Sequence, residues 1–259
     1  MSNVFLFIYS FLLVSGLMTI VWVMQLKNKN AGIVDVVWAI SFMCSTILFS
    51  LLIDGYTLRA YIVIGLVSCW CVRLGYHLFI RNWGEPEDAR YASMREKWGT
   101  KANLNMFLFF QFQALASAIL SFPFVLILRN PSYTFSVIEI LGFLLFVIAI
   151  IGEAASDSQL KQFKRTAKKM EVCTVGLWNY SRHPNYFFEW LIWVSIFIIA
   201  LPAPYGWVAL YCPLLMWHFL NNVTGIAITE LHMLQTRGNV YLNYQKATSA
   251  FIPWFKLKR

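Results

Sequence analysis

Long apolar stretches separated by short polar segments dominate the chain from end to end. Crossing a roughly 30 Å hydrocarbon core takes about 20 consecutive apolar residues. Windows of that kind predict seven spans, at about residues 4–24, 33–53, 60–80, 106–128, 134–152, 186–202 and 206–227. The pattern therefore predicts an all-α polytopic membrane protein, a seven-transmembrane-helix bundle that forms a single transmembrane domain over residues 1–259.

The composition agrees with this pattern. Of the 259 residues, 59% are hydrophobic and only 13% are charged, whereas a soluble domain carries roughly a quarter charged residues. The first span begins with the uncharged Met1-Ser2-Asn3 and has no small-residue cleavage site. We therefore expect it to be a retained helix and not a removed signal peptide.

The basic residues indicate the orientation. The chain holds 21 Lys and Arg against 12 Asp and Glu, for a net charge of +9. With seven spans, eighteen of the 21 fall on one side; Arg59 and Arg129 fall on the other, and Arg73 lies inside a span. The positive-inside rule places the N-terminus outside and the C-terminus in the cytoplasm. The charge therefore indicates topology and attraction to anionic membrane lipids, not nucleic-acid binding.

Neither a metal site nor a soluble nucleotide fold is predicted. The five cysteines match no metal-ligand spacing apart from an isolated Cys69-x-Cys71, so we expect them to be small buried hydrophobic residues. The chain has no Walker loop, no Gly-x-Gly-x-x-Gly and no His-Glu-x-x-His.

A few ionisable residues lie within or at the ends of spans. Each costs on the order of 3 kcal/mol in the membrane, so such groups usually face the bundle interior or a water-filled cavity. Arg73 and His77 are four residues apart and share a helix face. Together with Asp35 and Glu189 they predict a polar cavity open to the cytoplasm. The simpler interpretation is that Asp35 and Glu189 pair with Arg73 or Arg182 and only fix helix register.

The segment after residue 152 continues with helical spacing. Asp157, Lys161 and Lys164 fall on one stripe. We therefore expect the helix of span 134–152 to extend into the cytoplasm and to carry basic side chains there.

A polar turn precedes the sixth span. Arg182 and His183 come directly before Pro184, which permits a helix to begin at or just after Asn185. Donor side chains beside a helix N-terminus suit the binding of phosphate.

Aromatic residues surround this turn, and a second polar cluster follows in the tail. Trp178, Tyr180 and Tyr186 could hold an adenine or nicotinamide ring, or could equally form an interfacial aromatic belt. The tail adds Glu230, His232, Arg237, Tyr241 and Tyr244.

Two motifs carry a family resemblance. Residues 176–190 read Gly-Leu-Trp-x-Tyr-Ser-Arg-His-Pro-Asn-Tyr-Phe-x-Glu-Trp, and residues 241–254 read Tyr-x-x-Tyr-Gln-x-x-Thr-Ser-Ala-Phe-Ile-Pro-Trp. Both resemble the steroid 5-alpha-reductase C-terminal superfamily, and within it the bacterial DUF1295 proteins. Asp-Val-Val-Trp at 35–38 and Arg-Asn-Trp-Gly-x-x-Glu-Asp-x-Arg-Tyr at 81–91 are similar to that group as well.

The resemblance implies an integral protein of the bacterial cytoplasmic membrane. It also implies an NADPH site on the cytoplasmic side, built within about residues 153–254. With the residues of the turn and tail, the candidate cofactor-binding set is Asp157, Lys161, Lys164, Tyr180, Arg182, His183, Asn185, Tyr186, Glu189, Glu230, His232 and Tyr244.

The implied reaction is reduction of an activated C=C bond in an apolar lipid or sterol-like substrate. The steroid enzymes carry Gln-Glu-Leu-Pro in the second span and a ketone-polarising Tyr in the third; this chain lacks the motif, and its nearest phenol is Tyr76. A steroid enone is therefore in doubt as the substrate. The candidates for the acid or carbonyl-orienting role are Asp35, Arg73, Tyr76 and His77.

Two alternatives stay open. Isoprenylcysteine carboxyl methyltransferases share the Arg-His-Pro-x-Tyr turn and a later Glu but bind S-adenosylmethionine, and Glu230 fits either cofactor. The seven predicted spans, Asp157 and Asn185 favour the reductase. A transporter or non-catalytic scaffold is less favoured, since transporters more often show internal repeats and helices broken at mid-membrane.

Overall fold

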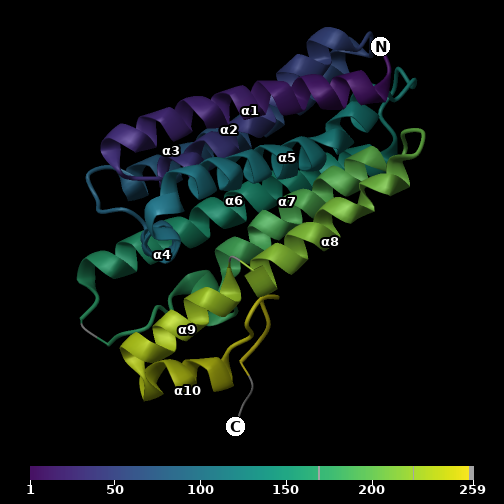
Figure 1. Cartoon of the computed structure of the whole chain (residues 1–259). Coiled ribbons are helices and arrows are strands. Elements are labelled where there is room, and N and C mark those ends of the chain that lie inside the picture. The colour runs from purple at the N-terminus through teal and green to yellow at the C-terminus, as the bar shows by residue number, and fades with distance from the viewer. Residues whose placement is uncertain (169, 224, 257–259) are drawn as a thin grey trace. The chain divides into compact units, whose positions relative to one another are not determined.

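The computed structural model describes residues 1–168, 170–223 and 225–256, which form helices and no named strand (Figure 1). Short 3-10 or π turns connect some helices: η1 (Gly99–Lys101), η2 (Gly176–Asn179), η3 (Gly206–Leu210) and η4 (Phe219–Val223). The α-helices are α1 (Asn3–Asn28), α2 (Ile33–Leu52), α3 (Thr57–Asn82), α4 (Ala89–Trp98), α5 (Ala102–Leu128), α6 (Val137–Thr166), α7 (Pro184–Ala200), α8 (Tyr211–His218), α9 (Ile226–Arg237) and α10 (Asn239–Ala247). The predicted all-α class is confirmed.

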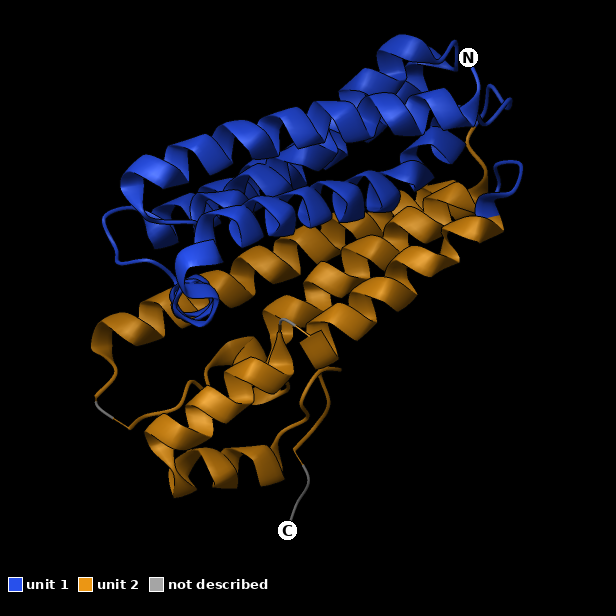
Figure 2. Ribbon diagram, in the orientation of Figure 1, with its two compact units in different colours: residues 1–134, 202–206 blue, residues 135–201, 207–259 orange. Residues whose placement is uncertain are grey.

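The chain divides into two compact units (Figure 2). Unit 1 comprises residues 1–134 and 202–206, and unit 2 comprises residues 135–201 and 207–259. The expected single transmembrane domain stays a prediction.

Five helical stretches of the described chain are long and apolar enough to cross a membrane: α1, α2, α3, α6 and the stretch Ala89–Leu128 that contains α5. They support an integral membrane protein. Helix α7 is apolar but has only 17 residues, and the expected last span at 206–227 is divided among η3, α8 and η4. The seven-span count and the orientation of the termini therefore stay predictions.

In unit 1, α1 packs against α2 and α5, and α2 also packs against α3 and α5. The core includes Met18 of α1 and Phe110 of α5, both fully buried. Polar side chains join the helices: Ser10 Oγ donates to Ser45 Oγ over 2.9 Å, and Ser15 Oγ donates to Gln111 Oε1 over 2.6 Å. Such bonds satisfy polar groups that lipid cannot.

Arg59, expected in a short outer loop, is instead fully buried in α3. Its Nη1 donates to the carbonyls of Asn130 and Ser132 over 3.2 and 2.7 Å, and its Nη2 donates to that of Thr134 over 3.0 Å. A buried guanidinium needs such acceptors, and they hold the loop after α5 against α3.

In unit 2, α6 and α7 approach closely because glycines line the crossing. A Cβ at Gly142 would lie 2.6 Å from Ile199 Cγ1, and one at Gly152 would lie 2.3 Å from the Phe188 ring. Helix α6 continues to Thr166, which confirms the predicted extension beyond residue 152. Helix α7 begins at Pro184, one residue before the predicted start, as suits proline in a first helical turn.

Candidate functional site

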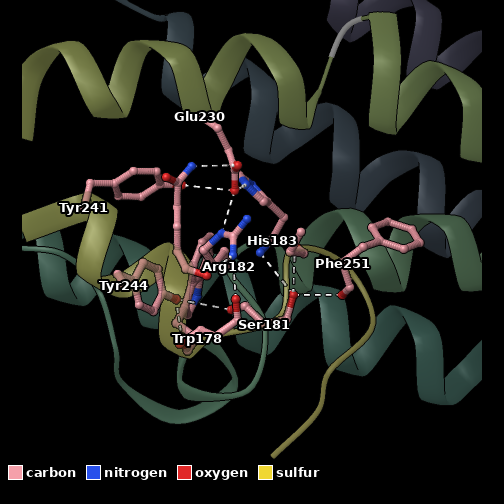
Figure 3. A network of polar contacts seen from close by, with 11 residues as sticks. Trp178, Ser181, Arg182, His183, Glu230, Tyr241, Tyr244 and Phe251 are labelled. Atoms are coloured by element: carbon pink, nitrogen blue, oxygen red, sulfur yellow. Dashed lines mark hydrogen bonds and ion pairs between the residues drawn. The ribbon is translucent and has the colours of Figure 1, made fainter. Parts of the chain in front are cut away.

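A carboxylate of α9 is the centre of the polar network in unit 2. Figure 3 shows the side chains of Arg182 and His183 converging on Glu230. Glu230 Oε1 accepts hydrogen bonds from Arg182 Nε at 2.6 Å, His183 Nε2 at 3.2 Å and Tyr241 Oη at 3.4 Å. Its Oε2 accepts from Gln245 Nε2 at 2.9 Å. One side chain thus joins the turn before α7 to both α9 and α10.

The Arg182 guanidinium also holds the C-terminal segment. Its Nη1 donates to the carbonyls of Gln245 and Thr248 over 2.8 and 2.5 Å, and its backbone N–H donates to Ser249 O over 2.8 Å. The side chain is only 10% exposed. The simpler interpretation, in which Arg182 pairs with Asp35 or Glu189, does not hold for Arg182, because its guanidinium pairs with Glu230 of α9.

The pKa values of Glu230 and His183 are set by burial and by their contacts in this network. Burial opposes ionisation of Glu230, but hydrogen bonds and charge from His183 and Arg182 lower its pKa to about 2. Burial also lowers the pKa of His183, more than the neighbouring carboxylate raises it. Because an ionised carboxylate can only accept, a neutral His183 donates its Nε2–H to Glu230.

The backbone of the turn is held by hydroxyl groups and by ring stacking. The Tyr244 hydroxyl donates to the carbonyls of Trp178 and Ser181. His183 stacks on Tyr186, with ring centroids 5.5 Å apart and planes 6° apart. The structure therefore brings together five predicted cofactor-site residues, which are Tyr186, Tyr244 and the Arg182, His183 and Glu230 cluster.

A second polar group lies where α6 and α7 meet. Asn185 Nδ2 lies 3.5 Å from Asp157 Oδ1, and Glu189, one turn after Asn185, accepts a hydrogen bond from Trp193 Nε1 at 3.2 Å. Asp157 and Glu189 are buried, whereas Asn185 is half-buried. The amide and the two carboxylates offer both donors and acceptors on one side of the helix pair.

The remaining predicted cofactor residues lie outside these two groups. Lys161 and Lys164 are exposed on the last turns of α6. Tyr180 is 40% exposed, and its ring lies edge-on to Phe255 at 6.1 Å. His232 lines an open cavity of about 450 Å³.

Asp35, the acidic candidate of unit 1, is held by residues of α4. Its Oδ1 accepts from Tyr91 Oη at 2.6 Å and its Oδ2 from Arg90 Nη2 at 3.0 Å, with Arg81 Nη2 at 3.9 Å. The simpler interpretation, in which Arg73 pairs with Asp35, does not hold for Asp35, because α4 supplies Arg90 as its partner.

The other three candidates for the acid or orienting role lie on α3. Arg73 and His77 are half-buried one turn apart, as the spacing predicted, and Tyr76 is 66% exposed. Within the described residues, no group of three or more His, Cys, Asp and Glu side chains could hold a metal ion.

A family model matches residues 21–248, a range that contains both polar clusters, and its family is described as a protein of unknown function, DUF1295. The chain belongs to the DUF1295 family. It is also 25% identical over 226 residues to an uncharacterized protein of Schizosaccharomyces pombe. That match covers 76% of this chain and 65% of the yeast protein, so the chain spans less than two thirds of its relative. No solved structure matches.

Sequence reasoning missed Gln245, and it placed Tyr241 in the polar tail without making it a candidate for the site. Tyr241 and Gln245, which bind Glu230, occupy one face of α10 together with Tyr244, and their spacing of three and four residues was a usable signal. Arg90 and Tyr91 belong to a family motif but were not candidates for the site. Nothing in the local pattern indicated that Lys168, Thr236 and Arg237 share a cavity with His232.

Proposed function

We propose that the chain is a membrane-embedded, NADPH-dependent reductase of a C=C bond in an apolar lipid or steroid-like substrate. The supporting observation is a surplus of positive charge around the polar residues of unit 2. Residues 153–259 contain eleven Lys and Arg against five Asp and Glu. Glu230 is already satisfied by Arg182 and His183, whereas Lys161, Lys164 and Lys168 are exposed. Such an environment favours a polyanionic ligand.

The residues present fit NADPH. Exposed lysines at the end of α6 can form charge-assisted hydrogen bonds with phosphate oxygens. The first turn of α7 presents backbone N–H groups beside them. Asn185 and Glu189, one turn apart, can orient a ribose or the nicotinamide amide. His183 and Tyr186 form a stacked pair that fixes the same turn.

The same charges argue against S-adenosylmethionine, the alternative cofactor. Its sulfonium is a cation, so its site needs acidic or aromatic partners. Glu230, the acidic residue shared with the methyltransferase pattern, already accepts hydrogen bonds from four side chains. A cationic ligand would have to displace donors that hold the fold together.

When bound, NADPH would supply the hydride, which is the difficult part of the chemistry. The protein must hold the reactants in register, exclude water and supply or orient a proton. We assign that last role to one of Asp35, Arg73, Tyr76 and His77. Asp35 accepts a hydrogen bond from the Tyr91 hydroxyl at 2.6 Å, which fixes the position of its carboxylate.

Melting temperatures of the purified protein with NADPH and with S-adenosylmethionine test the proposal. A ligand at 100 times its Kd stabilises by about 2.7 kcal/mol, so we expect NADPH to raise the melting temperature clearly and S-adenosylmethionine to leave it unchanged. Asn185→Ala and Glu189→Ala should remove the NADPH shift while the unliganded protein stays folded. Asn243→Ala, at an exposed position of α10, is the matched control.

Stabilisation by S-adenosylmethionine alone would refute the reductase proposal and support the methyltransferase. No response to either compound would favour a non-catalytic membrane protein.

A further inference from the structure

The cavity that His232 lines is rich in cationic groups. It has a volume of about 450 Å³ and is open to solvent. Lys168 and Met170 line it from the segment after α6, and His232, Thr236 and Arg237 line it from α9. None of these five residues is acidic. A volume of this size fits part of a nucleotide or a comparably small ligand.

The walls of the cavity are fixed by contacts that leave its cations available. Arg237 Nε donates to Glu171 O over 2.8 Å, which ties the segment after α6 to α9. The Glu171 carboxylate accepts from the backbone N–H of Lys168 at 3.0 Å, which shapes the segment that carries Lys168 and Met170. Thr236 Oγ1 donates to His232 O over 2.8 Å and lies 3.3 Å from Arg237 Nη1.

Of the α9 residues that line the cavity, His232 lies on a different face of the helix from Glu230. Residues two positions apart in a helix point about 200° away from each other, so Glu230 and His232 face opposite sides. The cavity is lined by five of the described residues and is open to solvent, so a larger ligand can place one terminal group in it.

Phosphate is the terminal group that matches this chemistry. Lys168 offers an ammonium with three donors and Arg237 a planar fork, while the Thr236 hydroxyl already donates to His232 O. A phosphomonoester presents three strong acceptor oxygens and close to two negative charges. Met170 supplies an apolar wall against which the attached sugar or base can pack.

We infer that this cavity binds the terminal phosphate of a phosphomonoester. The identity of the ligand rests on the proposed function: the phosphate is the 2′-phosphate of NADPH. Lys168 and Arg237 then make the site select NADPH over NADH. These two residues act on cofactor choice and not on the reduction itself.

The test compares the affinities of NADPH, NADH and adenosine 2′,5′-bisphosphate for the purified full-length protein and its variants. Charge-assisted hydrogen bonds are roughly twice as strong as those between neutral groups. We therefore expect Lys168→Gln to weaken NADPH and the bisphosphate by about tenfold or more and to leave NADH unchanged. Arg237→Gln should do the same. Lys246→Gln removes an equal charge from α10 outside the cavity and should change all three affinities less than twofold.

Arg237→Gln also removes the anchor to Glu171 and could disturb folding, so Lys168→Gln is the decisive variant. If wild-type protein binds NADPH and Lys168→Gln weakens NADPH and NADH equally, or neither, the cavity assignment is overturned while the proposed reductase stands. If neither dinucleotide binds wild-type protein, both fail together. In a further outcome, Lys168→Gln loses binding to vesicles containing phosphatidic acid while its NADPH binding is unchanged. That result assigns the cavity to a lipid headgroup and overturns the cofactor assignment.

Discussion

Each unit holds a polar cluster centred on a carboxylate, and the two clusters differ in their charge balance. In unit 1, Asp35 accepts from Arg90 and Tyr91. In unit 2, Glu230 accepts from Arg182 and Tyr241 in a similar way, and from His183 and Gln245 as well. The first cluster is matched, with three arginines facing three carboxylates: Arg81, Arg90 and Arg95 against Asp35, Glu87 and Asp88.

The matched cluster has an architectural role. Glu87 accepts from Arg95 Nη2 at 2.8 Å and from the Ala31 N–H at 2.9 Å, and Asp88 caps α4 by accepting from the Arg90 N–H at 3.0 Å. These contacts hold α4 over the loop between α1 and α2. In unit 2, Glu230 makes comparable contacts, yet the unit also has exposed lysines and a cationic cavity. Matched charge indicates packing, whereas surplus charge indicates a ligand.

The largest effect is expected from removing the unit 2 carboxylate. Glu230→Ala leaves Arg182, which is 10% exposed, without its counter-charge, and breaking a buried pair costs about 3–5 kcal/mol. We expect a large drop in melting temperature and loss of NADPH binding. Thermal unfolding in detergent measures the first effect, and cofactor titration at low temperature measures the second.

Glu171→Gln serves as the control, because Glu171 is exposed. It should change the melting temperature little. A Glu230→Ala protein as stable as wild type would show that the network does not hold α9 and α10.

The next largest effect is expected where α6 packs against α7. A Cβ at Gly142 would lie 3.0 Å from the backbone nitrogen of Ile199, which cannot swing aside. Gly142→Ala should therefore destabilise the protein by about 1–3 kcal/mol. Gly16→Ala in α1, where nothing lies within 4 Å, should be neutral or stabilising by up to about 1 kcal/mol. Chemical denaturation of both variants measures the difference, and equal effects would contradict the close packing of α6 and α7.

A smaller change tests whether the unit 1 cluster stabilises the fold without contributing to NADPH binding. Tyr91→Phe removes only the 2.6 Å hydrogen bond to Asp35 and should cost about 1–2 kcal/mol of stability. Because this bond belongs to the matched cluster, the Kd for NADPH should stay within twofold of wild type. Calorimetry gives the stability and a titration gives the Kd. A strong loss of NADPH affinity with unchanged stability would reverse the roles assigned to the two clusters.

Acid should loosen unit 2 before unit 1. The pKa of His183 is held below its ordinary 6.5 by burial, so below about pH 6.5 the unfolded state binds more protons and stability falls as pH falls. Burial opposes ionisation of Glu87 and Asp88, but hydrogen bonds from Arg95 and Arg90 lower their pKa values below 4.5 and 3.8. The stability they contribute is therefore lost only in more acidic solution.

Hydrogen exchange between pH 5 and 8, followed by mass spectrometry, resolves the two units. Peptides of α9 and α10 should lose protection below about pH 6.5 while those of α4 keep it. His183→Gln keeps a donor near Nε2 and should remove this pH dependence. The same dependence in the variant would assign the loss to another group.

Sequence periodicity predicted the helical class and the approximate bounds of α1, α2, α3, α5 and α7, because long apolar runs and Pro184 act locally. The extension of α6 to Thr166 followed from the spacing of Asp157, Lys161 and Lys164. The pairings were harder to predict, since Arg182 reaches Glu230 across 48 residues and Asp35 reaches Arg90 across 55. Only the folded path of the chain determines which of several arginines is nearest.

The candidate site was only partly predicted, again because its contacts depend on the folded path of the chain. The Arg182, His183 and Glu230 cluster formed as a unit, but the sequence did not reveal that its charges satisfy one another. It likewise gave no sign that His232 shares a cavity with Lys168 and Arg237. Helical phase places side chains around one helix, while a cavity between segments depends on tertiary packing.

The Kd for NADPH at low and high ionic strength, measured beside that for S-adenosylmethionine, tests the central claim most directly. Surplus positive charge predicts NADPH binding that weakens by about tenfold or more between roughly 0.05 and 0.5 M salt, because the Debye length shrinks to a few ångströms. S-adenosylmethionine should not bind at either salt concentration. Absence of NADPH binding at low salt, or binding of S-adenosylmethionine in its place, would contradict the account.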